Sequence, residues 1–345
     1  MLERLNELPR VALLDAPTSV HRLRRLERTL GSEVRIYVKR DDLGLLGGGG
    51  NKLRKLEYLL GDAITQGCDT FITTGGLQSN HARLSAAAAA RTGLSCELFL
   101  TRVVPRDDED YRRNGNVLLD GLFGAMIHEL PGDADALAAA HARADELRRG
   151  GRRPYVVGMG GSSPIGCLGY VAAAVELLAQ EAALGDHFAQ IVLPNGSGGT
   201  HAGLAAGFAA SGHDPRRIRS FAVLASSDRS HQDTLRVARD TLDLLGSGAG
   251  IEDEQIVVSA GQLGAGYGIP TAAMIKAVQS VARSEGLLLD PVYGGKAFAG
   301  LLADLRQGVF AAKSAVLFLM TGGLPGLHAY RSVFEGAGKE PSVDM

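Results

Sequence analysis

Short apolar runs alternate with longer alanine- and leucine-rich segments along most of the chain. The short runs have the length and residue types of buried β-strands, and the longer segments carry residues that favour helices. Alternation of this kind predicts an α/β fold with two open, largely parallel sheets flanked by helices. The expected strands span 35–39, 70–74, 97–101, 154–157, 190–193, 220–224 and 315–319, and the clearest expected helices span 82–92, 134–149 and 169–184.

Two lobes are expected because 345 residues exceed the usual size of a single hydrophobic core. Only the charged stretch 102–113 has the composition of a loop fully exposed to solvent. Glycine is more abundant at several strand-to-helix junctions than a simple turn requires. In open α/β sheets, ligands bind beyond the carboxyl ends of the strands, so these junctions predict one substantial cleft. The glycine-rich junctions are 47–50, 75–76, 160–161, 196–199 and 322–323.

The overall composition is that of an ordinary globular protein, with 45% hydrophobic residues, 21% charged residues and a formal net charge of −2. No basic excess points to a nucleic-acid partner. We expect no membrane partner, because the strongest apolar run, 315–320, has strand length and we identify no stretch approaching the roughly 20 apolar residues that cross a bilayer. The N-terminal segment MLERLNELPR is charged where a secretory signal would be apolar.

Cysteine usage also bears on location. Cys68, Cys96 and Cys167 are an odd number of thiols without the spacing of metal ligands. We therefore expect reduced, mostly buried thiols, no metal site and a cytoplasmic protein.

Lys52 follows the glycine run 47–50 and stands at the expected start of a helix. A helix N-terminus has unpaired N–H groups and a partial positive charge, which lower the pKa of a nearby amine and attract anions. Amine catalysis requires such a lysine, because only the neutral form attacks a carbonyl carbon. A phosphate-binding loop of the Walker type is excluded, since Lys52 lies between Asn51 and Leu53. A surface lysine after a flexible loop remains the alternative.

The segment 73–83 ends an expected strand at a glycine pair and opens a helix with the residues Gln78, Ser79, Asn80 and His81. Ser79 has the position of an N-cap residue. Four polar residues in succession are more than a cap needs, so they are expected to surround a ligand at this helix end.

A strand, a loop and a helix also follow one another around Gly196, Ser197, Gly198, Gly199 and Thr200. Backbone N–H groups and hydroxyls in such a loop form an anion site. His201 stands where the dinucleotide fingerprint needs its third glycine, so a phosphate monoester fits better than a pyrophosphate. His201 itself is expected to serve packing or capping.

Two tyrosines, Tyr267 and Tyr293, lie in glycine-rich settings, and Thr321 follows the most apolar expected strand. Each tyrosine is either core filling or part of the cleft. Thr321 is expected at the carboxyl end of its strand.

Together these segments resemble the pyridoxal-phosphate enzymes of the tryptophan-synthase-β type, which is fold type II. More narrowly, they resemble the family that contains D-cysteine desulfhydrase, L-cysteate sulfo-lyase and 1-aminocyclopropane-1-carboxylate (ACC) deaminase. The resemblance implies a large domain of residues 1–53 and 163–345 and a small domain of residues 54–162, with a cleft between them. The matching stretches, in family order, are VKRDDL, GGNKLRKLEYLL, QSNHAR, NGNVLLD, GSGGTHAGL, GYGIP, LLLDPVYGGKAFAGL and TGGLPGL.

The resemblance also implies roles for particular residues. Lys52 would form the Schiff base with the cofactor and later move the α-proton of the substrate. Ser79 would face the substrate carboxylate or act as an acid/base, with His81 beside the substrate. Asn80 would bind substrate and the 3′-oxygen of the cofactor.

The same resemblance assigns the other side of the cofactor. Gly196 to Thr200, with help from Lys55, would hold the phosphate of pyridoxal 5′-phosphate. Tyr267 and Tyr293 would line the substrate pocket and take part in catalysis, with Tyr293 against the cofactor ring. Thr321 would lie near the pyridine nitrogen.

Gly294 departs from the family pattern. Deaminases of the family have an acidic residue at this place and desulfhydrases usually a threonine, facing the pyridine nitrogen. An acid would keep that nitrogen protonated, so its absence argues against opening of the cyclopropane ring.

The sequence therefore predicts a carbon–sulfur lyase that converts D-cysteine to pyruvate, sulfide and ammonia, or L-cysteate to pyruvate, sulfite and ammonia. ACC deaminase activity, giving 2-oxobutanoate and ammonia, is the alternative within the family. A non-catalytic module that binds a phosphorylated metabolite is the alternative of another class. A homodimer is expected by the resemblance alone.

Overall fold

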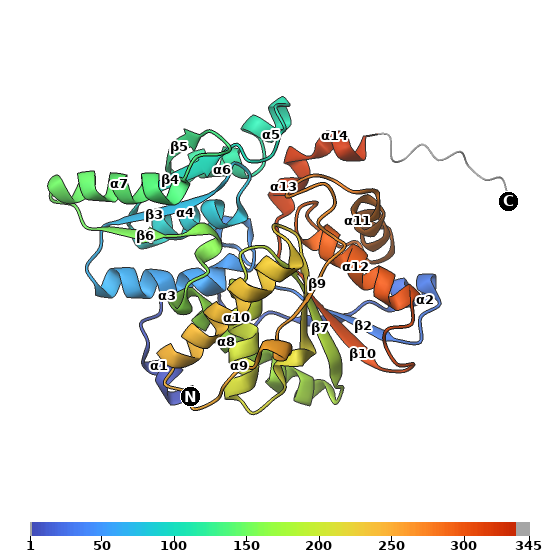
Figure 1. Ribbon diagram of the computed structural model, residues 1–345. Helices are drawn as coiled ribbons and strands as arrows, with labels where there is room; N and C mark the ends of the chain where they lie inside the picture. Colours follow the sequence, from blue (N-terminus) through green and yellow to red (C-terminus); the bar gives the residue numbers. More distant parts are fainter. Residues whose placement is uncertain (1, 336–345) are drawn as a thin grey trace.

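The computed structural model describes residues 2–335 and contains two sheets, each flanked by helices (Figure 1). The larger sheet has the strand order β1-β2-β10-β7-β8-β9, and all neighbours in it are parallel except β1 and β2. The smaller sheet has the order β5-β4-β3-β6 and is entirely parallel. The predicted α/β fold with two largely parallel sheets is confirmed. The strands are β1 (Val20–Arg22), β2 (Arg35–Lys39), β3 (Thr70–Gly76), β4 (Ser95–Thr101), β5 (Met126–Leu130), β6 (Pro154–Val157), β7 (Phe188–Asn195), β8 (Ile218–Ala222), β9 (Val257–Ser259) and β10 (Ala315–Leu319).

The expected strands 35–39, 154–157 and 315–319 agree with β2, β6 and β10 to the residue, while β8 begins and ends two residues before the expected 220–224. Three strands were not predicted: β1, β5 and β9. Each is short and lies at the edge of a sheet, and β5 is partly exposed along its length. A continuous apolar run, which was the signal used, is absent from a half-exposed edge strand.

The helices follow the sequence signals for their ends. Ser79 and Ser163 cap α4 and α8 by accepting a hydrogen bond from the backbone N–H three residues later, and Pro164 occupies the first turn of α8. The helices are α1 (Leu2–Glu7), α2 (Arg24–Leu30), α3 (Lys52–Thr65), α4 (Asn80–Thr92), α5 (Glu109–Arg113), α6 (Asn116–Leu122), α7 (Ala136–Arg149), α8 (Pro164–Leu184), α9 (Gly199–Ala210), α10 (Ser227–Leu244), α11 (Ala272–Glu285), α12 (Gly294–Arg306), α13 (Leu324–Ala329) and α14 (Arg331–Phe334), with 3₁₀ turns at Leu46–Gly48, Met159–Gly161, Pro215–Arg217 and Asp253–Gln255.

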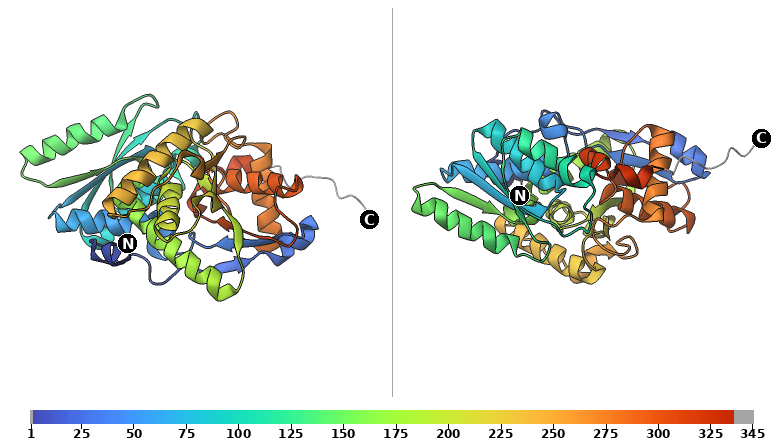
Figure 2. Two further views of the ribbon diagram at one scale, coloured as in Figure 1. Left: turned by 60° about the horizontal axis from the view of Figure 1, so that its bottom comes forward. Right: turned by 90° about the horizontal axis from the view of Figure 1, so that it is seen from above.

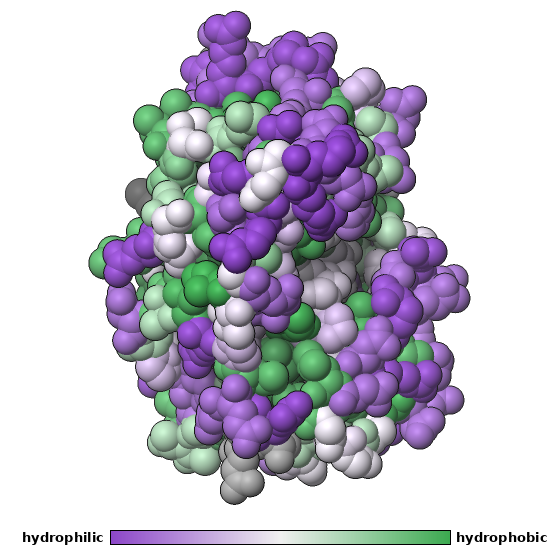
Figure 3. Space-filling view, turned by 90° about the vertical axis from the view of Figure 1, so that its left-hand side faces the viewer, coloured by the Kyte–Doolittle hydropathy of each residue, from purple (hydrophilic) through white to green (hydrophobic). Residues whose placement is uncertain are grey.

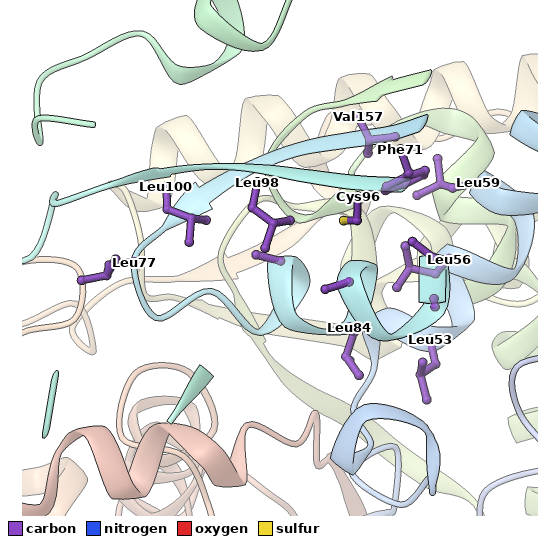
Figure 4. Close-up of a cluster of buried hydrophobic side chains, with 14 of the residues drawn as sticks. Leu53, Leu56, Leu59, Phe71, Leu77, Leu84, Cys96, Leu98, Leu100 and Val157 are labelled. Carbon is purple, nitrogen blue, oxygen red and sulfur yellow. The ribbon is translucent and has the colours of Figure 1, made fainter. Parts of the chain in front are cut away.

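The core beneath the smaller sheet joins its strands to α3 and α4 (Figure 4). Phe71 and Leu98 point from the sheet toward the helices, and Leu56 of α3 lies beneath Phe71, whereas Leu84 lies on the far face of α4, near Leu53. These side chains are fully buried. Burial of this size, about 1.5–3 kcal/mol for each large aliphatic or aromatic side chain, fixes the first turns of α3 and α4 against the sheet.

Helix α8 corrects one expectation from the sequence. Its 21 residues are long and apolar enough, by length and composition alone, to cross a membrane, so the statement that no stretch approaches a span was wrong. Half of its apolar stretch is buried inside the protein, where it packs against α3 and α9. The expected helix start at residue 169 was also late, because the glycines Gly166 and Gly169 concealed the first turns.

The stretch 102–113, expected to be fully exposed, is not. Val104 and Tyr111 in it are buried, and residues 109–113 form α5. The Arg106 guanidinium lies 4.8 Å from the ring centroid of Tyr330 and 5.8 Å from that of Tyr111. This stretch therefore joins the smaller sheet's side of the molecule to α13 and α14.

The two sheets lie at opposite ends of the molecule. The smaller sheet with α7 is at one end, and α2, α11 and α12 with the outer part of the larger sheet are at the other (Figures 1 and 2). On the flank at the α7 end, hydrophilic residues predominate and interrupt the apolar areas (Figure 3). All strands of the smaller sheet lie within residues 54–162, the proposed small domain. The division at residues 53/54 and 162/163 remains a proposal.

Candidate active site

Three of the five glycine-rich junctions, 75–76, 160–161 and 196–199, contribute to one cleft between the two sheets, while 47–50 and 322–323 stand next to the lining residues Asn51 and Thr321. The cleft holds about 690 Å³ of empty space, part of it continuous with solvent. The lining residues are Asn51, Lys52, Gly76, Ser79, Asn80, His81, Met159, Gly160, Pro194, Asn195, Gly196, Ser197, Gly198, Gly199, Thr200, His201, Leu224, Tyr267, Tyr293 and Thr321.

Lys52 is the first residue of α3 and its side chain reaches into this cleft. Its Nζ donates to Asn51 Oδ1 at 3.0 Å, and Asn51 Nδ2 donates to Thr200 Oγ1 at 3.1 Å. The amine is thus linked through one side chain to the glycine loop that starts α9. The alternative of a surface lysine is excluded by this position.

The surroundings of Lys52 favour its neutral form. Burial is the largest cause that lowers the pKa of Lys52, and the positive charges of Lys55 and Arg83 lower it further. The carboxylate of Asp290 opposes this change. The net effect is a pKa of about 7 for Lys52. A substantial fraction of the amine is therefore unprotonated at neutral pH, as a nucleophile or general base requires.

The loop from Gly196 to Thr200 joins the end of β7 to the start of α9 and has the form of an anion site. Gly198 has a φ of 82°, so the chain turns sharply before the helix. A Cβ on Gly199 would lie 2.5 Å from Ser162 Oγ, and one on Gly196 would lie 3.0 Å from the Tyr293 ring. Glycine at these two positions lets the loop pack closely on Ser162 and Tyr293, and a helix N-terminus of this kind offers backbone N–H groups to an anion.

Lys55 lies behind this loop and not on the wall of the cleft. Its Nζ donates to Gly160 O and to Ser162 Oγ, both at 3.0 Å, and Ser162 Oγ accepts from Gly199 N at 3.1 Å. Burial lowers the pKa of Lys55 to about 8. Its charge reaches the loop through Ser162, so direct contact with a phosphate stays a prediction.

Ser79 and Asn80 are brought together at the start of α4. Ser79 Oγ accepts from Ala82 N at 3.1 Å, so the hydroxyl is the N-cap of the helix and also borders the cleft. Asn80 Oδ1 accepts from Asn116 Nδ2 at 3.0 Å. Because the carbonyl oxygen of Asn80 is engaged in this way, its Nδ2 is the group left to donate to a ligand.

His81 is held in one tautomer. The Thr73 hydroxyl donates to Val157 O at 2.9 Å, so its oxygen must accept from His81 Nε2, also at 2.9 Å. The other ring nitrogen, Nδ1, is buried and has no hydrogen-bond partner among residues 2–335. Burial and the charges of Lys52 and Lys55 hold the pKa of His81 well below its usual value. The ring therefore borders the cleft as a neutral acceptor.

The two tyrosines line the cleft and contact each other. Their hydroxyl oxygens are 2.6 Å apart, and their rings are tilted by 60° with centroids 5.9 Å apart. The Tyr267 loop is fixed by Lys296, which donates to Leu263 O at 2.7 Å and Gly266 O at 3.0 Å, and by Tyr330, whose hydroxyl donates to Gly268 O at 2.8 Å. Burial is the largest cause of the raised pKa of both Tyr267 and Tyr293, so both phenols remain protonated.

Thr321 borders the cleft after the end of β10, as expected, and Gly294 is buried at the start of α12, next to Asp290, without lining the cleft. The Asp290 carboxylate accepts from Val292 N, Tyr293 N and Gly294 N at 3.0, 2.8 and 2.7 Å. Burial raises the pKa of Asp290 to about 6 although these backbone donors and Lys52 oppose the rise. Asp290 is thus the acidic group that acts on Lys52.

Several functional residues were not identified from the sequence. Asn51, Ser162 and Asp290 each contact a predicted site residue, but their roles depend on contacts between distant segments. The adjacent letters in GGNKL and DPVYGG were the available signal for Asn51 and Asp290. His201 is buried, with Nδ1 2.8 Å from Ser220 Oγ, and it also borders the cleft, so its expected packing role stays a prediction.

The three cysteines are not paired with one another, and Cys96 and Cys167 are buried, which confirms the expectation of mostly buried thiols. In the part of the chain that the structure describes, no group of three or more His, Cys, Asp or Glu side chains is placed to hold a metal ion.

The comparisons with known proteins all find pyridoxal-phosphate-dependent enzymes or their relatives. The family model described as pyridoxal-phosphate dependent enzyme matches residues 11–322. A 1-aminocyclopropane-1-carboxylate deaminase of Methylobacterium nodulans is 39% identical over 338 residues, covering 97% of this chain and 99% of the relative. A D-cysteine desulfhydrase of Salmonella choleraesuis is 41% identical over 329 residues, covering 95% of this chain and 98% of the relative.

Among solved structures, one described as an ACC deaminase homologue has a TM-score of 0.86 at 36% identity, covering 97% of this chain and 98% of the other. An O-ureido-L-serine synthase has a TM-score of 0.63 at 17% identity over 98% of this chain and 96% of the other, which shows a shared fold alone.

Proposed function

This chain belongs to the pyridoxal-phosphate-dependent enzymes, as a lyase of the ACC deaminase and D-cysteine desulfhydrase family, and on that premise we propose that it eliminates a sulfur group from a small amino acid. The proposed reactions are D-cysteine with water to pyruvate, sulfide and ammonia, or L-cysteate with water to pyruvate, sulfite and ammonia. The observation that carries the proposal is the link from Lys52 through Asn51 to Thr200, which places an amine of lowered pKa and an anion loop in one cleft.

The residues present fit pyridoxal phosphate. The glycine loop 196–200 stands at the start of α9, where backbone N–H groups would receive a phosphate, and Gly199 packs so closely on Ser162 and Lys55 that a Cβ there would disturb the loop. The amine of Lys52 would bond the cofactor aldehyde, Asn80 Nδ2 would donate to the oxygen on the ring, and Tyr293 would lie against the ring. When bound, the cofactor supplies an electron sink for the charge that develops at the substrate Cα.

The chain's own residues would divide the remaining work. Lys52 would take the α-proton, because its amine is partly neutral at neutral pH. The N–H groups at the start of α4, with the Ser79 hydroxyl, would bind the substrate carboxylate. His81 Nδ1 accepts but cannot donate, so it would favour a donor on the substrate over a second carboxylate oxygen.

The tyrosine pair is suited to donate a hydrogen bond to a leaving group. With 2.6 Å between the hydroxyls, one phenol donates to the other and the second retains a proton for the cleft. Their raised pKa values keep both phenols protonated, so this hydroxyl would stabilise the negative charge of a departing sulfur group without giving up its proton.

Gly294 supports the sulfur lyase over the deaminase. The resemblance places residue 294 at the pyridine nitrogen, and glycine offers no side chain there. The nearby Asp290 carboxylate is engaged by three backbone N–H groups. The hydroxyl of Thr321 is then the side-chain group left at this edge of the cleft, and it does not supply the positive charge on the nitrogen that an acid would.

ACC deaminase remains the second candidate because relatives with that name share 39% identity over almost the whole chain. A product assay separates the two. Purified enzyme would be tested with D-cysteine, L-cysteine, L-cysteate and the cyclopropane amino acid, measuring pyruvate, 2-oxobutanoate, sulfide and sulfite. Pyruvate with sulfide or sulfite is expected; 2-oxobutanoate as the main product would overturn the proposal.

Lys52 argues against a non-catalytic module that only binds a phosphorylated metabolite, because such a module would not need a neutral amine in its cleft. The family supports action on a small amino acid. We further propose a cytoplasmic homodimer without nucleic-acid or membrane partners. The net charge of −2 and the free thiols support this, and sedimentation of the purified enzyme tests the dimer.

A further inference from the structure

The four glycines that precede Lys52 form a turn pressed between the two halves of the molecule. Gly47, Gly48, Gly49 and Gly50 all have positive φ values, of 59°, 76°, 73° and 134°. A Cβ on Gly47 would lie 2.7 Å from Ala87 Cβ of α4, and one on Gly322 would lie 2.8 Å from Gly50 Cα. Glycine populates positive and negative φ about equally, so four successive glycines do not favour this conformation by themselves. Contacts from both sides must therefore hold the turn.

Arg83 of α4 supplies the contact on one side. Its Nη1 donates to Gly47 O at 2.7 Å and its Nη2 donates to Gly49 O at 3.1 Å. On the other side, Asn51 N donates to Thr321 O at 3.0 Å. The guanidinium therefore joins α4 to the segment that ends at Lys52.

The burial of Arg83 is more than packing requires. The side chain is 0% exposed, and its Nε has no hydrogen-bond partner among the described residues. The carboxylate of Asp120 in α6 interacts with it electrostatically, yet neither Asp120 oxygen has a hydrogen-bond partner within residues 2–335. A charge buried with so little compensation is costly, and a methionine of similar length would fill the same space without that cost.

We propose that Arg83 is a positioning residue for Lys52: by holding the carbonyls of Gly47 and Gly49 it fixes the turn that delivers the Lys52 amine into the cleft. The proposal rests on the proposed function of Lys52. The same helix presents Ser79, Asn80 and His81 at its first turn, and Arg83 N donates to Ser79 O at 3.2 Å. One helix thus places both the carboxylate site and, through Arg83, the amine.

The charge of Arg83 has a second effect on Lys52. Lys55 and Arg83 disfavour a proton on the amine, Asp290 favours it, and His81 is neutral. Tyr267 and Tyr293 also face the cleft and remain protonated, and burial lowers the pKa of His201, another titratable group of the lining, to about 3, so it is neutral. Removal of the Arg83 charge would therefore raise the pKa of the Lys52 nitrogen.

Two variants separate the effect of the two Arg83 hydrogen bonds to Gly47 O and Gly49 O, here called the clamp, from the effect of the Arg83 charge. Arg83→Met loses both, whereas Arg83→Lys keeps a charge but cannot reach two carbonyls with a planar fork. Arg217→Met is the matched control, because Arg217 also donates hydrogen bonds to a backbone carbonyl, Phe188 O. This carbonyl lies at the opposite end of β7 from the cleft. The readouts are titration of the visible absorbance band of the holoenzyme with pH, and kcat and KM measured separately.

For Arg83→Met we expect the pKa of the absorbance band to rise by about one unit and kcat to fall on the order of 100-fold with a smaller change in KM. For Arg83→Lys we expect a similar fall in kcat with the band pKa near that of wild type. Arg217→Met should match wild type in both. If Arg83→Met does not fold, Arg83→Lys decides alone.

An Arg83→Lys enzyme with wild-type kcat would overturn the clamp, and so would an Arg83→Met holoenzyme that matches Arg217→Met in both readouts. The spectral titration needs no substrate. A wild-type enzyme that binds the cofactor but turns over none of the four amino acids would contradict the proposed function and leave this test intact.

Discussion

Asn51 donates from Nδ2 to Thr200 Oγ1 at 3.1 Å while its Oδ1 accepts from Lys52, so one amide joins the amine to the phosphate loop. This contact spans 149 residues of sequence and crosses from the start of α3 to the start of α9. The Asn51 side chain therefore links the Lys52 amine to the loop 196–200, although an asparagine at this position has no evident chemical role of its own.

Replacement Asn51→Asp tests the electrostatics of this link. A carboxylate beside the amine stabilises the ammonium form, so the pKa of Lys52 should rise from about 7 by about one unit or more. Less of the amine is then neutral at pH 7, and the acid limb of the kcat/KM profile should move to higher pH. Asn51→Ala removes the bond without adding charge and should lower activity without that upward movement. An unshifted profile in Asn51→Asp would show that the amine does not carry the acid limb.

The tyrosine pair predicts a coupled loss of activity. Tyr267→Phe and Tyr293→Phe each remove one hydroxyl of a 2.6 Å contact, and each should lower kcat on the order of 100-fold. Because the two share one hydrogen bond, the double variant should lose much less than the product of the single losses. Tyr37→Phe, which removes a hydroxyl bonded to Asp186 away from the cleft, is the control. Strictly multiplicative losses would contradict a shared proton.

The glycine loop predicts a selective loss of cofactor affinity. In Gly199→Ala the new Cβ would meet Ser162 Oγ at 2.5 Å and Lys55 Nζ at 2.7 Å, so the loop must move and its N–H groups turn from the phosphate. We expect the dissociation constant for pyridoxal phosphate to rise at least 10-fold, measured by fluorescence titration. Gly248→Ala has no heavy atom within 4 Å of its Cβ and should bind normally. Equal affinities in the two variants would place the phosphate elsewhere.

A buried ion network below the site predicts a pH-dependent stability. Arg54 donates to Asp41 and Glu176, and Lys39 pairs with Glu176. Burial alone would raise the pKa of Asp41, but the charge and hydrogen bonds of Arg54 outweigh it and lower the pKa of both carboxyls. Groups with a lowered folded-state pKa stabilise the protein above their ordinary values near pH 4, and this contribution is lost as the pH falls through the folded values.

Arg54→Met should therefore lower the free energy of unfolding by about 3–5 kcal/mol at neutral pH, because two buried carboxylates lose their partner. The free-energy deficit of the variant should narrow as the pH falls toward 4, because its buried carboxyls lack Arg54 and become protonated, while those of the wild type stay ionised until lower pH. Urea unfolding at neutral pH and near pH 4 measures it. Arg229→Met breaks an exposed pair with Asp233 and should cost less than about 1 kcal/mol. A deficit that stays constant with pH would exclude the electrostatic explanation.

Much of the fold was predictable because buried parallel strands are continuous apolar runs. Strands β2, β6 and β10 carried that signal and were located to the residue. The edge strands β1, β5 and β9 did not, since their stability comes from pairing with a neighbour and not from their own composition. Helix α8 was begun too late because Gly166, where a Cβ would lie 2.1 Å from Gly161 O, reads as a helix breaker.

The residues of the site also fall into a group that the sequence predicted and a group that it did not. Lys52, Ser79 and the loop 196–200 were found because a glycine run next to a polar cluster is visible along the chain. Asn51, Asp290 and Arg83 act through segments distant in sequence, and their letters alone predict nothing about those contacts. Lys55 was assigned to the phosphate by resemblance, and the structure places Ser162 between its amine and Gly199 N.

The central claim is that the amine of Lys52 bonds the cofactor and then serves as the base. Purified holoenzyme reduced with borohydride and digested should carry the pyridoxyl mass on the peptide that contains Lys52. Lys52→Ala should carry no label and lose activity by far more than a few-fold, since nucleophile and base are both removed. Label on another lysine, such as Lys55 or Lys296, or only a few-fold loss in Lys52→Ala, would contradict the account.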